Sequence, residues 1–120
     1  MAQRAGQLGA AAEEEVARLV SARGWRLLER NWRCRFGEID LIARDGDTVV
    51  FIEVRHRSDD RFGGAAASID RAKQRRLSRA AQLYLSGYSD IPPCRFDVVV
   101  RGAGSGRYEW IEAAFELVAN

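Results

Sequence analysis

The sequence has little of several residue types that would point to particular classes of protein. Its two cysteines form no CxxC pair, and its single histidine, His56, does not stand at ligand spacing from either. We therefore expect no zinc site and free thiols in a reducing cytoplasm. No apolar run approaches the ~20 residues that cross a bilayer, and residues 1–15 lack the apolar core of a signal peptide. These absences predict a cytoplasmic protein with no membrane partner.

Proline is almost absent as well, since the chain has only Pro92 and Pro93. No repeat and no proline- or serine-rich linker divides the 120 residues. A chain of this length has room for one hydrophobic core, so we expect a single domain over residues 1–120. The apolar fraction of 47% and the charged fraction of 30% are those of an ordinary globular domain.

Lysine is the scarcest charged residue, because Lys73 is the only lysine among 19 basic residues. The formal net charge of +2 says little about partners, whereas the distribution of charge says more. Between Asp70 and Asp90 the chain carries five basic residues and no acid. Such a segment is either a solvated helix face in an arginine-rich protein or a phosphate-binding surface. Composition alone leaves both interpretations open.

Hydrophobic periodicity predicts an α/β fold with elements in the order αβββαββ. The expected helices cover residues 8–23 and 68–86, and the expected strands cover 25–29, 38–43, 48–54, 96–100 and 108–111, with a basic loop at 31–37 and a short helix or turn at 113–118. The strand at 48–54 is apolar on both faces, which is typical of a central strand covered on both sides. This order favours a three-layer sandwich in which helices flank a central mixed sheet.

An Asp-Gly pair between two apolar runs predicts a tight hairpin. With a two-residue turn at Asp45-Gly46, Asp40 faces Phe51 and Glu38 faces Glu53. A three-residue turn without a compensating bulge would break this parity. Because side chains alternate with a period of two, one face of the hairpin is expected to carry Glu38, Asp40, Glu53 and Arg55.

The acids on this face suggest a metal site. In the expected register Asp40 and Glu53 are diagonal neighbours, with Cβ atoms about 7 Å apart or less. Carboxylates that converge on a sheet lose water, so they need a proton or a cation. Mg²⁺ is held by one or two carboxylates together with water and substrate phosphates. The alternative is a plain ion pair between Glu53 and Arg55 on the same face of the strand.

Three segments together resemble the YraN-like family of bacterial proteins: residues 37–43 (GEIDLIA), 50–55 (VFIEVR) and 62–66 (FGGAA). The resemblance extends through nearly the whole chain. That family is assigned to the PD-(D/E)xK restriction-endonuclease-like superfamily and is similar in pattern to archaeal Holliday-junction resolvases. The resemblance implies a restriction-endonuclease-like sandwich and a Mg²⁺- or Mn²⁺-dependent nuclease that acts on DNA. Branched recombination or repair intermediates are candidate substrates, and a homodimer is favoured.

The resemblance also implies roles for individual residues. Asp40 and Glu53 match the catalytic, metal-binding acids of the superfamily, and Glu13 matches a metal-binding glutamate of the first helix. Arg55 stands where the superfamily usually has lysine. Because arginine stays protonated, Arg55 would stabilise charge on the phosphate and leave the general base unassigned.

Further residues are expected at the edge of this site. Lys73 is the only lysine available to the site, and Gln74 stands beside it. Both are accessory candidates, as is Glu38. Contacts to the nucleic-acid backbone would come from phosphate-binding arginines, and the candidates are Arg33, Arg35, Arg71, Arg75, Arg76 and Arg79.

Other functions remain open from the sequence. The first is a non-catalytic nucleic-acid-binding protein that keeps the nuclease fold, which Arg55 favours. Retention of three acids favours the enzyme, because acids repel a phosphate that is merely bound. The second is a protein-interaction module anchored by tryptophans, although such residues are more often in the core. Asp97 is expected to be solvated or to lie behind the metal ligands, and His56 to lie at the surface.

Overall fold

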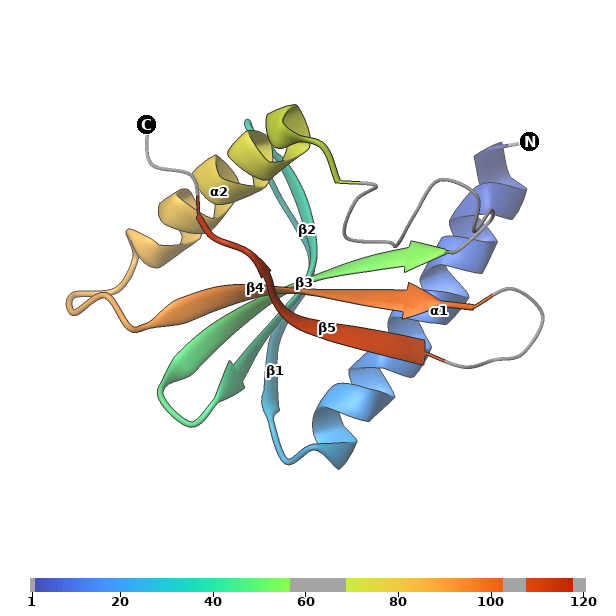
Figure 1. The fold of residues 1–120 in the computed structure, drawn as a ribbon, viewed down its shortest axis with the longest axis horizontal. Coiled ribbons are helices and arrows are strands. Elements are labelled where there is room, and N and C mark those ends of the chain that lie inside the picture. The colour runs from blue at the N-terminus through green and yellow to red at the C-terminus, as the bar shows by residue number, and fades with distance from the viewer. Residues whose placement is uncertain (1, 57–68, 103–107, 118–120) are drawn as a thin grey trace.

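The computed structural model describes residues 2–56, 69–102 and 108–117. Within these ranges the order αβββαββ is found, which confirms the predicted fold class (Figure 1). The elements are α1 (Ala2–Ala22), β1 (Arg26–Cys34), β2 (Gly37–Asp45), β3 (Thr48–His56), α2 (Arg71–Leu85), β4 (Cys94–Arg101) and β5 (Tyr108–Phe115). The segment 62–66 quoted above lies outside the described residues. No helix in the described part of the chain is long and apolar enough to cross a membrane.

The five strands form one mixed sheet in the order β1-β2-β3-β4-β5. Strands β3 and β4 are parallel, and the other three neighbouring pairs are antiparallel. The chain between the two parallel strands contains α2, as such a connection requires. Residues 49–53 of β3 are all buried, which confirms the expectation of a covered central strand.

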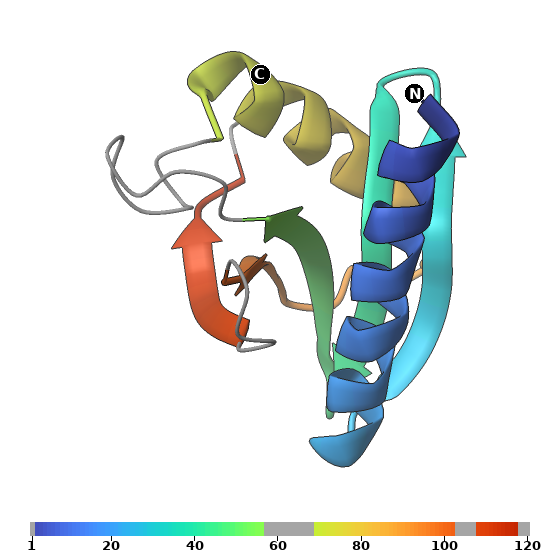
Figure 2. The ribbon, with the colours of Figure 1, turned by 90° about the vertical axis from the view of Figure 1, so that its right-hand side faces the viewer.

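The two helices cover opposite faces of the sheet. Val50 and Ile52 of β3 pack in a cluster with Val16 and Val20 of α1. Their neighbour in β3, Phe51, packs instead in a cluster with α2. Because successive side chains of a strand point to opposite faces, α1 and α2 lie on different sides of the sheet, and the molecule has three layers. Figure 2 shows α1 running alongside β1 and β2.

The register of the β2–β3 hairpin differs from the prediction by two residues. Asp45 pairs with Thr48, so the turn residues are Gly46 and Asp47. Gly46 takes the left-handed conformation at φ 57°, which glycine adopts without strain. The ladder ends one step before Asp40 and Glu53, with Leu41 opposite Ile52, so these two acids lie across from each other rather than diagonally. A shift of two residues keeps the same face, so the expectation that both acids share a face is retained.

Two segments expected outside the sheet are strands. Residues 31–34 continue β1 along β2, where Trp32 pairs with Ile39. Residues 113–115 continue β5 along β4, where Phe115 pairs with Phe96 and stacks on it at 4.7 Å. Both strands are at the edges of the sheet. Residues 31–34 are rich in polar side chains and so resemble a loop, whereas Ala113 and Ala114 resemble part of a helix or turn.

Candidate metal centre

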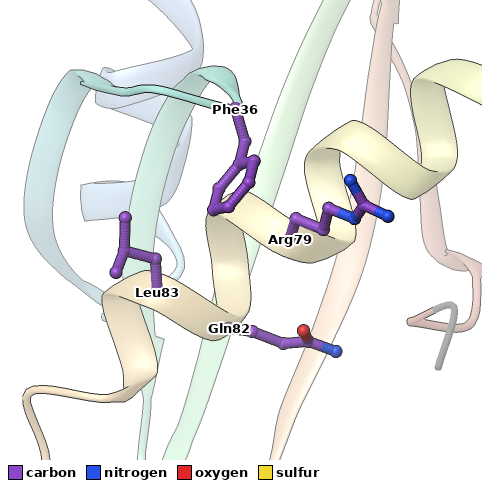
Figure 3. Close-up of a pocket in the computed structure, with 4 residues that line it drawn as sticks. All are labelled: Phe36, Arg79, Gln82 and Leu83. Carbon is purple, nitrogen blue, oxygen red and sulfur yellow. The ribbon is translucent and has the colours of Figure 1, made fainter. Parts of the chain in front are cut away.

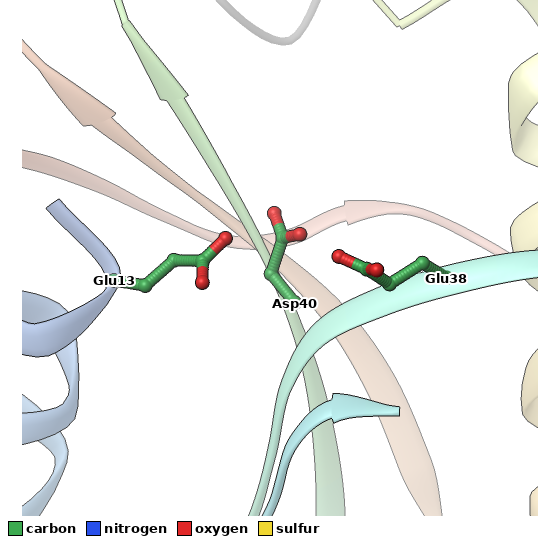
Figure 4. A group of neighbouring side chains, drawn as sticks. All are labelled: Glu13, Glu38 and Asp40. Atoms are coloured by element: carbon green, nitrogen blue, oxygen red, sulfur yellow. The ribbon is translucent and has the colours of Figure 1, made fainter. Parts of the chain in front are cut away.

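Three half-buried carboxylates converge where α1 meets β2 (Figure 4). Glu13 comes from α1, and Glu38 and Asp40 come from β2. One carboxylate oxygen from each residue lies within 4.8 Å of the other two. An all-oxygen donor set of this kind suits a hard cation such as Mg²⁺ or Mn²⁺.

The packing of α1 fixes the position of Glu13. Val16 and Val20, which are three and seven residues further along, are fully buried against the sheet. Side chains at these spacings share one face of a helix. Glu13 therefore extends from the buried stripe of α1 toward β2. Its neighbour Glu14 forms an ion pair with Arg30 of β1 instead.

Backbone and strand contacts hold the two acids of β2. The backbone N–H of Val54 donates to Asp40 Oδ2 at 2.9 Å, a bond that crosses from β3 to β2 just beyond the last ladder pair. Arg33 Nε on β1 donates to Glu38 Oε2 at 2.6 Å. Both carboxylates are thus oriented by neighbouring strands before any ligand binds.

Glu53 lies beside this cluster and is the most deeply buried acid of the site, with 4% of the residue exposed. Its Oε2 is 2.9 Å from Lys73 Nζ. Its Oε1 is buried and has no hydrogen-bond partner among the described residues. An unsatisfied buried carboxylate oxygen costs free energy, and a bound cation would satisfy it. The donors present therefore fit a divalent metal.

A hollow of about 250 Å³ joins these groups. Its lining combines acids of β2 and β3 with cations of α2: Phe36, Gly37, Glu38, Asp40, Glu53, Lys73, Arg76 and Leu77. Of the three acids expected to bind metal, Asp40 and Glu53 share this hollow, and Glu13 approaches Asp40 from α1. Glu38, expected only as an accessory residue, is the third member of the carboxylate cluster.

The surroundings of the acids oppose their ionisation. Burial, followed by the charge of Glu53, raises the pKa of Asp40 from 3.8 to about 7, although the bond from Val54 opposes the rise. Burial and the charge of Asp40 also raise the pKa of Glu13. At neutral pH Asp40 therefore holds a proton for much of the time, and a cation that replaced this proton would remove the repulsion.

Lys73 reaches the acids because of the way α2 begins. Asp70 is the N-cap of α2, and its Oδ1 accepts from the backbone N–H of Lys73 at 2.7 Å. Gln74 donates from Nε2 to the carbonyl of Ile69 at 3.0 Å, so its amide secures the start of the helix. Arg55 is half-buried opposite Val100 of β4 and is not among the described residues that line the hollow. The proposed roles of Gln74 and Arg55 stay predictions.

Four of the six predicted phosphate-binding arginines gather next to the hollow. A second hollow of about 340 Å³ is lined by Arg35, Phe36, Ala72, Arg75, Arg76 and Arg79. Arg76 and Phe36 belong to both hollows, so the two are adjacent. Arg33 is the ion-pair partner of Glu38, and Arg71 is exposed at the first turn of α2. The basic surface therefore begins at the edge of the acidic site.

Comparison with known proteins places this site in a family. Residues 12–100 match the model described as uncharacterised protein family UPF0102. The chain belongs to the UPF0102 family. It is 56% identical over 113 residues to a UPF0102 protein of Nitrosomonas europaea, which covers 93% of this chain and 96% of that one. A UPF0102 protein of Hahella chejuensis is 50% identical over 111 residues, covering 90% and 89%. The YraN-like resemblance is confirmed at this level.

The UPF0102 match includes the whole candidate centre. All four acids and Lys73 lie within residues 12–100. The description of UPF0102 names no activity.

One buried acid of this UPF0102 chain has a structural role that the sequence did not indicate. Asp97 is fully buried rather than solvated. It accepts from Arg95 Nε at 3.0 Å, from Trp110 Nε1 at 2.9 Å and from the backbone N–H of Ala113 at 3.0 Å. The bonds from Trp110 and Ala113 join β4 to β5, so Asp97 holds the edge strand, while the bond from Arg95 lies within β4. In the sequence Asp97 is only one polar residue between Phe96 and Val98, and this pattern does not indicate hydrogen bonds to β5.

Proposed function

We propose that this UPF0102 protein is a metal-dependent nuclease that hydrolyses phosphodiester bonds, with DNA as the expected substrate. The observation that carries the proposal is the cluster of Glu13, Glu38 and Asp40, which lies beside a hollow rich in arginine. Acids that bind a cation and cations that bind phosphate are both needed to hold a phosphodiester at a metal. The αβββαββ sandwich with acids on β2 and β3 supports membership of the PD-(D/E)xK superfamily.

The acids would hold Mg²⁺ or Mn²⁺. Glu13, Glu38 and Asp40 offer converging oxygens, and Glu53 offers a buried oxygen that needs a partner. The bound ion would polarise the phosphate and acidify a water molecule. The carboxylates of the chain would orient that water.

Lys73 would take over the work of the lysine that is replaced by Arg55. Its ammonium lies on the wall of the hollow, 2.9 Å from Glu53. From there it can donate a hydrogen bond to a phosphate oxygen or to the attacking water. Arg76 lines the same hollow and would neutralise charge on the phosphate. Lys73 on α2 would thus supply the ammonium that the superfamily usually places where Arg55 stands on β3.

One observation favours the non-catalytic alternative. Lys73 already pairs with Glu53, which supplies this buried acid with a counter-charge without any metal. A protein that had lost turnover could keep the pair for stability and use the arginines to bind nucleic acid.

The homodimer expected from the resolvase resemblance is a further proposal, tested by the mass in solution.

A cleavage experiment separates these functions. Labelled single-stranded, duplex, flapped and four-way-junction DNA, with matched RNA, is incubated with Mg²⁺ or Mn²⁺. Wild type is compared with Asp40→Asn and Glu53→Gln, and Glu14→Gln is the matched control because Glu14 pairs with Arg30 outside the cluster. The nuclease predicts metal-dependent cutting that only the first two variants lose. If the wild type and all three variants bind the nucleic acids equally and none of them cuts, the nuclease proposal is wrong and the non-catalytic alternative takes its place.

A further inference from the structure

A third hollow, of about 410 Å³, lies further along α2 than the acidic site and the arginines. It is lined by Phe36, Arg79, Gln82 and Leu83 (Figure 3). We propose that this hollow is a binding pocket for one unpaired nucleobase of the nucleic acid whose backbone passes the acidic site. The inference rests on the proposed function and specifies the class of substrate.

The lining has the chemistry that a nucleobase needs. Phe36 belongs to the β1–β2 turn and stands over α2, where Leu83 lies on the apolar side of the hollow (Figure 3). Arg79 and Gln82 extend on the other side. Bases stack on aromatic rings and on guanidinium planes, and a glutamine amide both donates and accepts hydrogen bonds at a base edge.

Cations already surround the ring of Phe36. The guanidinium carbon of Arg35 is 4.7 Å from the ring centroid, and that of Arg79 is 6.0 Å from it. Arg35 is exposed, so its side chain can leave the ring when a base arrives. The same guanidinium groups would then meet the phosphates that flank the base.

The three hollows are connected through shared walls. Phe36 lines all of them, Arg76 joins the acidic hollow to the arginine hollow, and Arg79 joins the arginine hollow to the third one. Lys73 and Leu83 are ten residues apart on α2, which corresponds to about 15 Å along the helix. A strand that follows the arginines away from the acids therefore brings one of its bases to the far end of the third hollow, beside Leu83, a few nucleotides from the cut.

Stacking on Phe36 requires a base with a free face. In a duplex both faces of each base are covered by its neighbours, so a base must be unpaired or turned out to enter the pocket. Single strands and the unpaired segments of flaps, gaps or junctions provide such bases. A continuous duplex provides them only at the cost of unstacking.

An abasic scan tests this pocket without any cutting. Fluorescent single strands of one sequence, each with one abasic position, are titrated with wild type, Phe36→Leu and Phe36→Tyr in EDTA. We expect one abasic position to weaken binding to wild type about tenfold, as loss of a stacked base does. Phe36→Tyr keeps the ring and the discrimination. Phe36→Leu keeps an apolar side chain and binds the intact and abasic strands equally.

The outcomes separate the two proposals. If wild type binds every abasic strand as tightly as the intact one, or if Phe36→Leu still discriminates, the base pocket is wrong while the nuclease proposal stands. If no strand binds to wild type at any salt concentration, the base pocket is wrong, and the cleavage experiment with metal decides the nuclease proposal separately. Thermal unfolding of each variant shows that the fold is kept.

Discussion

Lys73 and Glu53 form an ion pair that ties the first turn of α2 to the central strand β3, with Nζ 2.9 Å from Oε2. The backbone N–H of the same lysine is bound by the helix cap Asp70. Lys73 is thus fixed at both ends, and the carboxylate that it meets is almost fully buried. The pair supplies the counter-charge that Glu53 needs when no metal is bound.

Replacing Lys73 should expose this dependence. Lys73→Met leaves Glu53 buried without its counter-charge, and we expect the free energy of unfolding to fall by about 1–3 kcal/mol. This is less than for a fully buried pair, because a third of the lysine side chain is exposed. Urea unfolding measures the loss. Saturating Mn²⁺ should recover most of it, because the metal replaces the ammonium.

The matched control for this change is Arg71→Met, two residues earlier on the exposed side of α2. It should alter the free energy of unfolding by less than about 0.5 kcal/mol. An equal loss for Lys73→Met with and without Mn²⁺ would mean that Glu53 takes no part in metal binding.

The raised pKa of Asp40 predicts how stability depends on pH. Between about 4 and about 7 the folded chain holds a proton that the unfolded chain releases, because the pKa rises from 3.8 to about 7 on folding. The free energy of unfolding therefore falls as pH rises through this window and levels off above it. Asparagine cannot ionise. In Asp40→Asn the free energy of unfolding should therefore fall by about 1–3 kcal/mol less than in the wild type over the same pH window. Thermal unfolding from pH 4 to pH 8 in EDTA measures the difference.

Bound Mn²⁺ should change the dependence of the free energy of unfolding on pH in the opposite direction. Protons and Mn²⁺ compete for Asp40, so the affinity for Mn²⁺ should rise as pH increases toward and through 7. The wild type then regains at high pH, in Mn²⁺, the stability that it lost in EDTA. Identical pH profiles for wild type and Asp40→Asn would contradict the assignment of the raised pKa to this residue.

The sequence was sufficient for the features that depend on local pattern. The order of elements followed from periodicity, and the central place of β3 followed from its apolar residues on both faces. Strand alternation predicts that Asp40 and Glu53 share a face of the sheet. They do so although the predicted register of the β2–β3 hairpin is wrong. A shift of two residues leaves every side chain on the same face of the strand. The shared face can therefore be predicted without the exact pairing.

Features that depend on distant contacts could not be found in this way. The turn lies one residue later than predicted because Asp45 pairs with Thr48 across the ladder, and of the two turn residues, Gly46 and Asp47, only Gly46 takes the left-handed conformation. The place of Glu38 in the carboxylate cluster depends on the packing of α1 beside β2, and no local spacing encodes that packing. The hydrogen bonds of Asp97 likewise join strands that are brought together only by the fold.

Glu13 and Glu14 offer a matched test of the metal centre, because they are neighbours on α1 with different partners. Glu13→Gln removes one charge from the carboxylate cluster, and we expect the affinity for Mn²⁺ to fall at least about tenfold. Glu14→Gln removes the same charge from the ion pair with Arg30 and should leave the affinity unchanged. Isothermal titration calorimetry measures both. If both variants lower the affinity for Mn²⁺ equally, Glu13 contributes only negative charge and is not a metal ligand.

Asp97 should affect stability and leave metal binding unchanged. It is fully buried and accepts hydrogen bonds from Arg95, Trp110 and Ala113. Asp97→Ala leaves these donors without their acceptor, and we expect a loss of about 3 kcal/mol in the free energy of unfolding. Urea unfolding gives the loss, and calorimetry below the unfolding transition gives the affinity for Mn²⁺. A large fall in this affinity would restore the expected place of Asp97 behind the metal ligands.

The basic surface predicts how binding depends on salt. Each phosphate contact that is lost lowers the slope of log K against log salt by about 0.7 for single strands and about 0.9 for duplex. Arg75 lines the arginine hollow on α2, so Arg75→Ala should lower the slope by one such step. Arg18 is exposed on α1, which covers the other face of the sheet, and Arg18→Ala removes the same charge. Fluorescence anisotropy at four salt concentrations gives each slope. A step for Arg75 alone assigns phosphate binding to α2, whereas equal steps for both variants would show only a response to net charge.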